Sequence, residues 1–152
     1  MKAKLLCTIT LFSFLIFSSI AATAAPTESN WQVAYKDNAN AFFFDTSTVK
    51  NLGSSYIVRA DLKTEISASA LQSLIEKYKD QYDVSTWNQI KYIISTTDYN
   101  AKDGTLLTKN HRFYDEKNML VVTIAEESKT TVPADSVQSK VYDAIFQWLY
   151  EN

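Results

Sequence analysis

Apolar and polar residues alternate along several segments of the chain, which is typical of strands that bury one face. The clearest alternation places Tyr56, Val58, Ala60 and Leu62 on one side and charged residues on the other. Similar patterns, separated by turn residues such as Asn, Asp and Gly, predict six strands at residues 31–36, 41–45, 56–63, 90–99, 106–114 and 119–125.

Two segments instead repeat their apolar residues at helical spacing. The first helix is predicted over residues 69–80, where Ser69 and Gln72 fit a capping box, and its stripe consists of Leu71, Ile75, Tyr78 and Tyr82. The second is predicted to begin after an N-cap at Asp135 or Ser136 and to end near Tyr150. Its broad apolar stripe contains Val137, Val141, Ala144, Ile145 and Trp148.

The element order is therefore βββα-βββα, which predicts the α+β class. We expect an antiparallel sheet of about six strands packed by the C-terminal helix. No linker or second domain is indicated, so residues 25–152 are expected to form a single domain.

The first 24 residues have the composition of a secretory signal peptide. Lys2 and Lys4 precede an apolar run over residues 5–20, and an alanine-rich stretch over residues 21–25 follows it. The run is shorter than the ~20 residues of a spanning helix, so cleavage and export to the periplasm, cell surface or medium are expected. The single cysteine, Cys7, lies in this segment, which leaves no thiol for disulfides or catalysis in the mature chain.

Charge and composition exclude several kinds of function. Without residues 1–24 the chain has 13 basic and 17 acidic side chains in no basic cluster, which argues against binding nucleic acid or anionic membranes. The single histidine, His111, excludes paired-histidine metal sites. It is interpreted as a plain sheet residue sharing a face with Leu107, Lys109 and Phe113. Only two glycines are present, so a glycine-rich phosphate loop is excluded.

Aromatic residues are abundant, and Phe42-Phe43-Phe44 must place rings on both faces of a strand. Side chains opposite the better apolar faces of their strands form a candidate interaction surface, consisting of Phe43, Ile57, Ile93 and Val121. Either the mid-chain helix or a loop covers this surface, or a protein partner or second copy does. A homodimer is therefore one of the predicted assemblies.

Several short motifs resemble the surface-adhesin protein E family of bacterial exported proteins. They are Trp31, Phe43-Phe44-Asp45, Asp98-Tyr99, residues 114–118 and residues 133–136. The resemblance implies an antiparallel sheet packed by a C-terminal helix and, in some members, adhesion to host extracellular proteins. Members commonly carry a cysteine pair between a late strand and that helix, and this chain has neither cysteine. The resemblance implies no catalytic residue.

The sequence thus predicts an exported, non-enzymatic binding domain, adhesin-like, that contacts a protein and uses no metal or cofactor. The alternative is a periplasmic module that binds a small ligand or inhibits an enzyme. A flat sheet surface would favour the adhesin-like function, whereas a deep apolar pocket would favour the alternative.

Overall fold

The computed structural model describes residues 30–37, 41–53 and 56–152. They form an eight-stranded antiparallel sheet and two α-helices, so the predicted α+β class is confirmed. The predicted signal peptide, residues 1–24, lies outside the described residues.

Six strands follow one another across the sheet in chain order, as the sequence predicts, and each pairs antiparallel with the next. They are β1 (Trp31–Lys36), β2 (Ala41–Asp45), β4 (Ile57–Glu65), β5 (Ile90–Asn100), β6 (Thr105–Asp115) and β7 (Leu120–Ile124).

Two further strands were not predicted. β3 (Lys50–Asn51) pairs with β4, and β8 (Ser128–Thr131) pairs with the first half of β6, whose second half pairs with β7. Both strands are polar and exposed, so no alternation of apolar residues marks them.

Helix α1 (Ala68–Tyr78) begins one residue before the predicted capping box, and its N-cap lies two residues before the predicted one. The hydroxyl of Ser67 accepts the hydrogen bond of the Ala70 amide at 3.2 Å, so Ser67 and not Ser69 is the N-cap. The prediction of a Ser69/Gln72 box was therefore wrong. A short 3₁₀ helix, η2 (Trp87–Gln89), leads from α1 into β5.

Helix α2 (Val137–Glu151) begins where the sequence predicts. The Ser136 hydroxyl accepts from the Ser139 amide at 3.1 Å, which satisfies one of the amide donors that a helix N-terminus leaves free. Residue 135 precedes the cap with a positive φ of 61°, which an aspartate tolerates better than most residues do.

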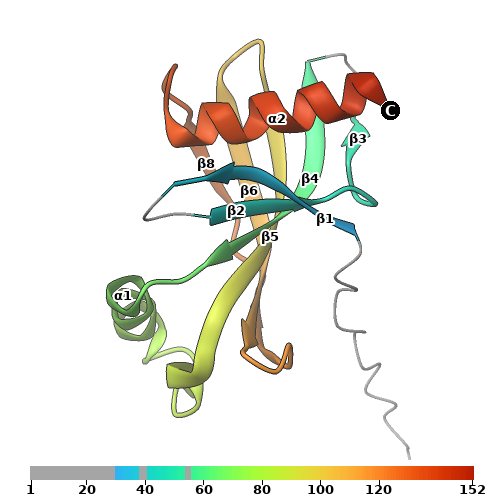
Figure 1. Ribbon diagram of the computed structural model, residues 1–152. Helices are drawn as coiled ribbons and strands as arrows, with labels where there is room; N and C mark the ends of the chain where they lie inside the picture. The colour runs from blue at the N-terminus through green and yellow to red at the C-terminus, as the bar shows by residue number, and fades with distance from the viewer. Residues whose placement is uncertain (1–29, 38–40, 54–55) are drawn as a thin grey trace, which may run out of the picture.

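The two helices cover opposite ends of the same face of the sheet (Figure 1). Val58, Ala60 and Leu62 of β4 pack under α2, whose Ile145 is fully buried. This first cluster is completed by Phe44, Tyr99, Val132, Val141 and Tyr142. The side of β4 that the sequence marks as apolar is thus the side that α2 covers.

A second cluster lies under α1 at the other end of that face. Trp87 of η2 is almost fully buried there and stacks on Phe113 of β6, with ring centroids 6.3 Å apart. The other buried members are Leu71, Tyr78, Ile90 and Ile124. Because the clusters occupy separate ends, a strip of polar sheet residues remains between them.

A bulge in β6 changes which residues share that strip. Ile94 pairs with Arg112 and Thr96 with Lys109, so β6 has one more residue than β5 over this interval. Asn110 lies within it at a φ of 52°, and such an extra residue reverses the alternation of side chains. His111 consequently lies on the helix side beside Ser95, whereas Lys109 lies on the other face beside Asp98. The predicted shared face of His111 and Lys109 was wrong.

Candidate functional site

The sheet face opposite the helices, here called the open face, carries a ladder of ion pairs across its three central strands. Asp98 of β5 accepts from the Nε and Nη2 atoms of Arg59 at 2.5 and 2.6 Å. It also accepts from Nζ of Lys109 at 3.2 Å. Asp61 of β4 accepts from Thr96 at 2.7 Å and from Arg112. No helix residue takes part in these interactions.

The Asp98 carboxylate is largely buried, with 12% of its side chain exposed. Burial by itself raises the pKa of Asp98, but the hydrogen bonds and charges of Arg59 and Lys109 outweigh burial and hold that pKa below its usual range. Asp98 is therefore charged at neutral pH, and its ion pairs join β4, β5 and β6.

Beside the ladder lies a lysine–aromatic patch, which consists of Trp31, Phe43, Lys63 and Tyr92. The Lys63 ammonium is 4.4 Å from the centroid of the Tyr92 ring, 5.9 Å from Trp31 and 6.0 Å from Phe43. These distances suit cation–π attraction. Tyr92 also stacks on Tyr114, with centroids 5.1 Å apart, which fixes the base of the patch. Among the described residues, no carboxylate pairs with Lys63.

The structure does not gather the four predicted surface residues on one surface. Phe43 belongs to the lysine–aromatic patch, and Ile57 lies at the far end of the open face opposite Asn100. Ile93 and Val121 instead pack against the cluster under α1. Two of the four residues thus belong to the packing around that buried cluster.

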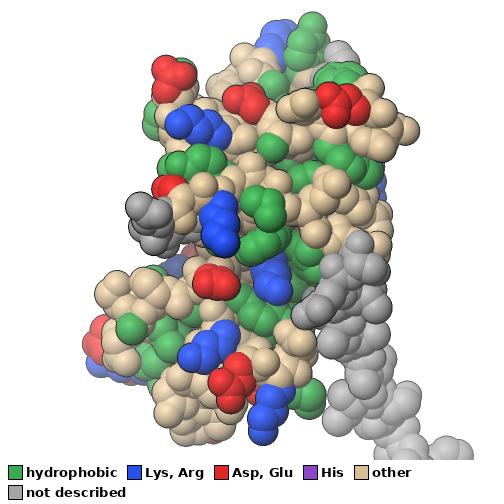
Figure 2. All heavy atoms as spheres, viewed as in Figure 1, with side chains coloured by type: hydrophobic (Ala, Val, Ile, Leu, Met, Phe, Trp, Pro, Cys, Tyr) green, Lys and Arg blue, Asp and Glu red, His purple; other side chains and the backbone are tan. Residues whose placement is uncertain are grey.

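Charged groups of both signs alternate with hydrophobic ones on the side of the molecule that Figure 2 shows, and no large area carries a single sign. The described residues contain no group of three or more His, Cys, Asp or Glu side chains placed to hold a metal ion. None of the helices among them combines the length and the apolar character needed to cross a membrane.

On the helix side, the polar strip contains a close contact between Ser95 and His111. The Ser95 hydroxyl lies 2.8 Å from Nδ1 of His111, at the border of a cavity of about 260 Å³ that His111 and Glu126 both line. Burial lowers the pKa of His111, nearby Glu126 raises it and Lys77 lowers it, with a net decrease. The imidazole is therefore neutral at pH 7.

Glu126 does not complete a catalytic triad with this pair. Its carboxylate accepts two hydrogen bonds from Lys77, at 2.8 and 3.0 Å, and one from the Tyr78 hydroxyl. Among the described residues, no carboxylate is hydrogen-bonded to the His111 ring. A catalytic triad needs a nucleophile, a base and an acid that orients the base, and this serine–histidine pair lacks the acid.

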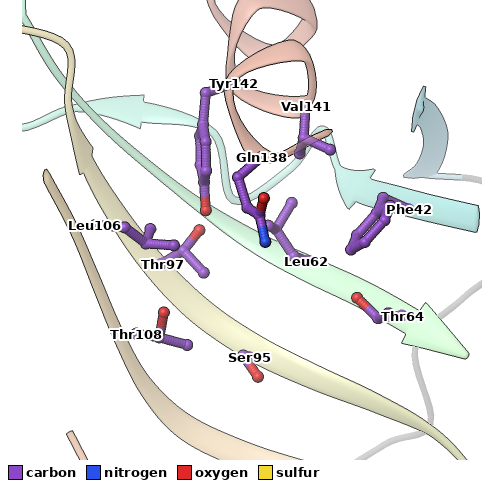
Figure 3. Close-up of a pocket in the computed structure, with 10 residues that line it drawn as sticks. All are labelled: Phe42, Leu62, Thr64, Ser95, Thr97, Leu106, Thr108, Gln138, Val141 and Tyr142. Atoms are coloured by element: carbon purple, nitrogen blue, oxygen red, sulfur yellow. The ribbon is translucent and has the colours of Figure 1, made fainter. Parts of the chain in front are cut away.

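Under α2, a second cavity of about 190 Å³ opens between the helix and the sheet (Figure 3). Phe42, Leu62 and Val141 give it apolar walls, and the hydroxyl of Tyr142 points into it from the helix. Tyr142 is 1% exposed, and its ring stacks on Tyr99 with centroids 4.3 Å apart.

The sequence could not have located the ladder or the cavity. The charged residues of β4 were recognised as one face of that strand. Their partners lie on β5 and β6, and the pairing with Asp98, Lys109 and Arg112 depends on the register of these strands and on the bulge in β6. The cavity combines residues of β2, β4, β5, β6 and α2, whose spacing in the chain carries no common pattern.

Comparison with known proteins identifies the fold. No family model and no curated protein matches the chain. The solved structure of Haemophilus influenzae protein E is similar with a TM-score of 0.53 and 12% identity, covering 85% of this chain and 92% of that one. A second crystal form of protein E gives a TM-score of 0.49 and 11% identity, covering 85% and 95%. The first of these likenesses shows that this chain has a protein E-like fold.

Proposed function

We propose that this protein is an exported, non-enzymatic binding domain, adhesin-like, whose open sheet face contacts a protein partner. The observation that carries the proposal is the lysine–aromatic patch beside the ion-pair ladder, on a face that neither helix covers. The protein E-like fold and the motifs that resemble the surface-adhesin protein E family support the same function.

The chemistry of this face favours a protein over a small molecule. Aromatic and cationic side chains are enriched among the residues that dominate protein–protein binding energy. Val33 lies on β1 opposite Phe43 and is 56% exposed, which extends the patch with an apolar group. The cavity under α2, at about 190 Å³, is smaller than the ~300–1,000 Å³ of pockets for drug-sized ligands.

The charge of this face favours one kind of partner segment. The ladder and Lys63 together contain four basic and two acidic side chains, whereas the whole chain has a net charge of −2. Within the described part of the chain Lys63 has aromatic neighbours and no carboxylate partner, so it can pair with an acidic group of a partner. An acidic segment with apolar anchors therefore complements this face.

A binding experiment tests this function. Purified residues 25–152 are exposed to a panel of immobilised extracellular-matrix proteins, and dissociation is followed by interferometry. For any matrix protein of the panel that binds, we expect Lys63→Glu and Phe43→Ser each to weaken the affinity of the domain for it at least tenfold. Tyr150→Ser, at an exposed α2 position on the opposite side, serves as the matched control and should bind like wild type.

Unchanged affinity in both patch variants would place binding elsewhere on the domain. Absence of binding to every member of the panel would contradict the adhesin-like function and favour the periplasmic alternative. Export is tested separately, since the mature protein recovered from the producing cell should begin at Ala25 or Pro26 by intact mass.

The non-enzymatic part of the proposal is supported by the arrangement around His111. Ser95 and His111 lie in contact, but the nearby Glu126 is engaged by Lys77 and Tyr78. We expect hydrolysis of p-nitrophenyl esters at the same rate by wild type, Ser95→Ala and His111→Ala. A rate that falls in both variants would make this pair a nucleophile and its base.

A further inference from the structure

The cavity between α2 and the sheet has the composition of a binding site for a small molecule. Its apolar groups form the sides and its hydroxyl groups come mainly from the neighbouring strands β4, β5 and β6 (Figure 3). The ten lining residues are Phe42, Leu62, Thr64, Ser95, Thr97, Leu106, Thr108, Gln138, Val141 and Tyr142. None of them is charged.

The Tyr142 hydroxyl is the strongest sign of a missing partner. It is buried, and no described residue hydrogen-bonds with it. Figure 3 shows the Thr97 hydroxyl beside it, close enough to lower the pKa of Tyr142, but the two groups do not meet at hydrogen-bond geometry, and the hydrogen of Thr97 is donated to the Ala60 carbonyl at 3.0 Å. Burial raises the pKa of Tyr142, so this hydroxyl stays protonated and can donate a hydrogen bond into the cavity. Buried hydroxyls usually have such a partner.

The helix supplies a second polar group at the same place. Gln138 lies one turn before Tyr142 on α2, and its amide points into the cavity (Figure 3). Thr108 of β6 lines the same cavity and carries a hydroxyl. Neither side chain makes a side-chain hydrogen bond among the described residues. The cavity therefore offers a donor and acceptors to a bound molecule.

Size and charge limit what can occupy this site. A cavity of about 190 Å³ exceeds the ~150 Å³ of an engineered protein cavity that binds benzene, so one six-membered ring with a substituent fits. A charged molecule would lose its hydration without gaining a counter-ion, because the lining is uncharged. We propose that this cavity binds a small, neutral, ring-sized molecule that carries one hydroxyl group, with Tyr142 as its hydrogen-bond partner. This site is separate from the open face and does not rest on the proposed protein binding.

Titration of the isotope-labelled domain with three probes tests the proposal by NMR. Phenol has a ring and a hydroxyl, toluene lacks the hydroxyl, and benzoate adds a charge. We expect saturable binding of phenol, weaker binding of toluene and no binding of benzoate. The methyl signals of Leu62, Leu106 and Val141 should shift, because these residues line the cavity.

Two variants distinguish the contribution of the hydrogen bond to affinity from the contribution of the space in the cavity. Tyr142→Phe should weaken phenol binding about fivefold, the worth of one hydrogen bond, and leave toluene unchanged. Thr108→Leu should abolish binding of both probes, because the larger side chain occupies the space. Tyr82→Phe removes the hydroxyl of an exposed residue beside Tyr78, away from this cavity, and should alter neither affinity. Far-UV circular dichroism and thermal unfolding confirm that each variant is folded.

Three results would overturn the proposal. The first is no saturable shift with phenol or toluene up to their solubility, which would mean that the cavity holds only water. The second is shifts confined to residues of the α1 cluster, such as Leu71 and Ile124, which would place the probe elsewhere. The third is an equal loss of phenol and toluene affinity in folded Tyr142→Phe, which would remove the assigned role of the hydroxyl.

Discussion

The Ser95 hydroxyl lies 2.8 Å from Nδ1 of His111, on the polar strip of sheet that separates the two buried clusters. The contact exists because the bulge at Asn110 turns His111 toward the helix side of β6. It places a titratable group in a half-buried position, where protonation is opposed mainly by loss of hydration.

Stability is therefore expected to fall as the pH falls below about 7. Burial lowers the pKa of His111 in the folded state below the roughly 6.5 of an exposed histidine. In this window the unfolded chain binds a proton that the folded chain does not, so protonation favours unfolding. Glu126 and Lys77 face the imidazole with opposite effects on its pKa, and the net change remains a decrease.

Urea unfolding at pH 7.5 and pH 5.5 measures this effect. Wild type should lose more free energy of unfolding between the two values than His111→Gln, which has no titrating group at that position. An equal loss in the two proteins would show that His111 has an ordinary pKa in the folded state. Glu126→Gln, examined in the same way, reports the part that this carboxylate contributes.

Much of the fold could be predicted because one side of most strands is buried. β1 and β2 have the predicted bounds, β5 is one residue longer at its C-terminal end, and β6 and β7 differ from their predicted bounds by one residue at each end. The N-cap at Ser136 was also recognisable, since its hydroxyl directly precedes the apolar stripe of α2.

The missed features have no such signal. β8 is polar and exposed along its whole length, and its pairing with β6 comes from the path of the chain. The bulge at Asn110 inserts a single residue and so reverses the faces of His111 and Lys109 relative to simple alternation. Alternation also grouped the four candidate surface residues, although the structure divides them between the open face and the cluster under α1.

Asp98→Asn is expected to destabilise the domain by about 1–3 kcal/mol. The neutral amide leaves the charges of Arg59 and Lys109 without their carboxylate in a half-buried part of the open face. The matched control is Glu76→Gln, which removes an exposed pair with Lys79 and should cost less than about 0.5 kcal/mol. Equal denaturation midpoints for Asp98→Asn and wild type would show that the ladder contributes nothing to stability.

Truncation along α2 should reveal which side chains attach it to the sheet. Ile145→Ala is expected to cost about 3–4 kcal/mol, because the side chain is fully buried. Trp148→Ala should cost about 2–3 kcal/mol, since Trp148 is only partly buried and meets Phe44 edge-on at 6.0 Å. Chemical denaturation of both variants gives the comparison, and a larger loss for Trp148→Ala would mean that the helix is held mainly by its aromatic end.

Self-association through the open face is opposed by its charge. A two-fold symmetric dimer places each patch against its own copy, so Lys63 and the ladder of one chain would face the same basic groups of the other. Like charges brought together in an interface cost free energy, and Lys63 has no carboxylate among the described residues to offset this.

The domain is therefore expected to sediment as a monomer at micromolar concentration and about 0.1 M salt, and Phe43→Ser should have the same sedimentation coefficient. A dimer that Phe43→Ser disrupts would contradict this prediction and assign the patch to a second copy of the chain. A dimer that persists in Phe43→Ser would instead use another surface, such as the exposed edges at β1 and β8, where unpaired backbone groups can pair with another strand. Deuterium exchange distinguishes these arrangements, because edge pairing protects the amides of an edge strand whereas packing of the patch does not.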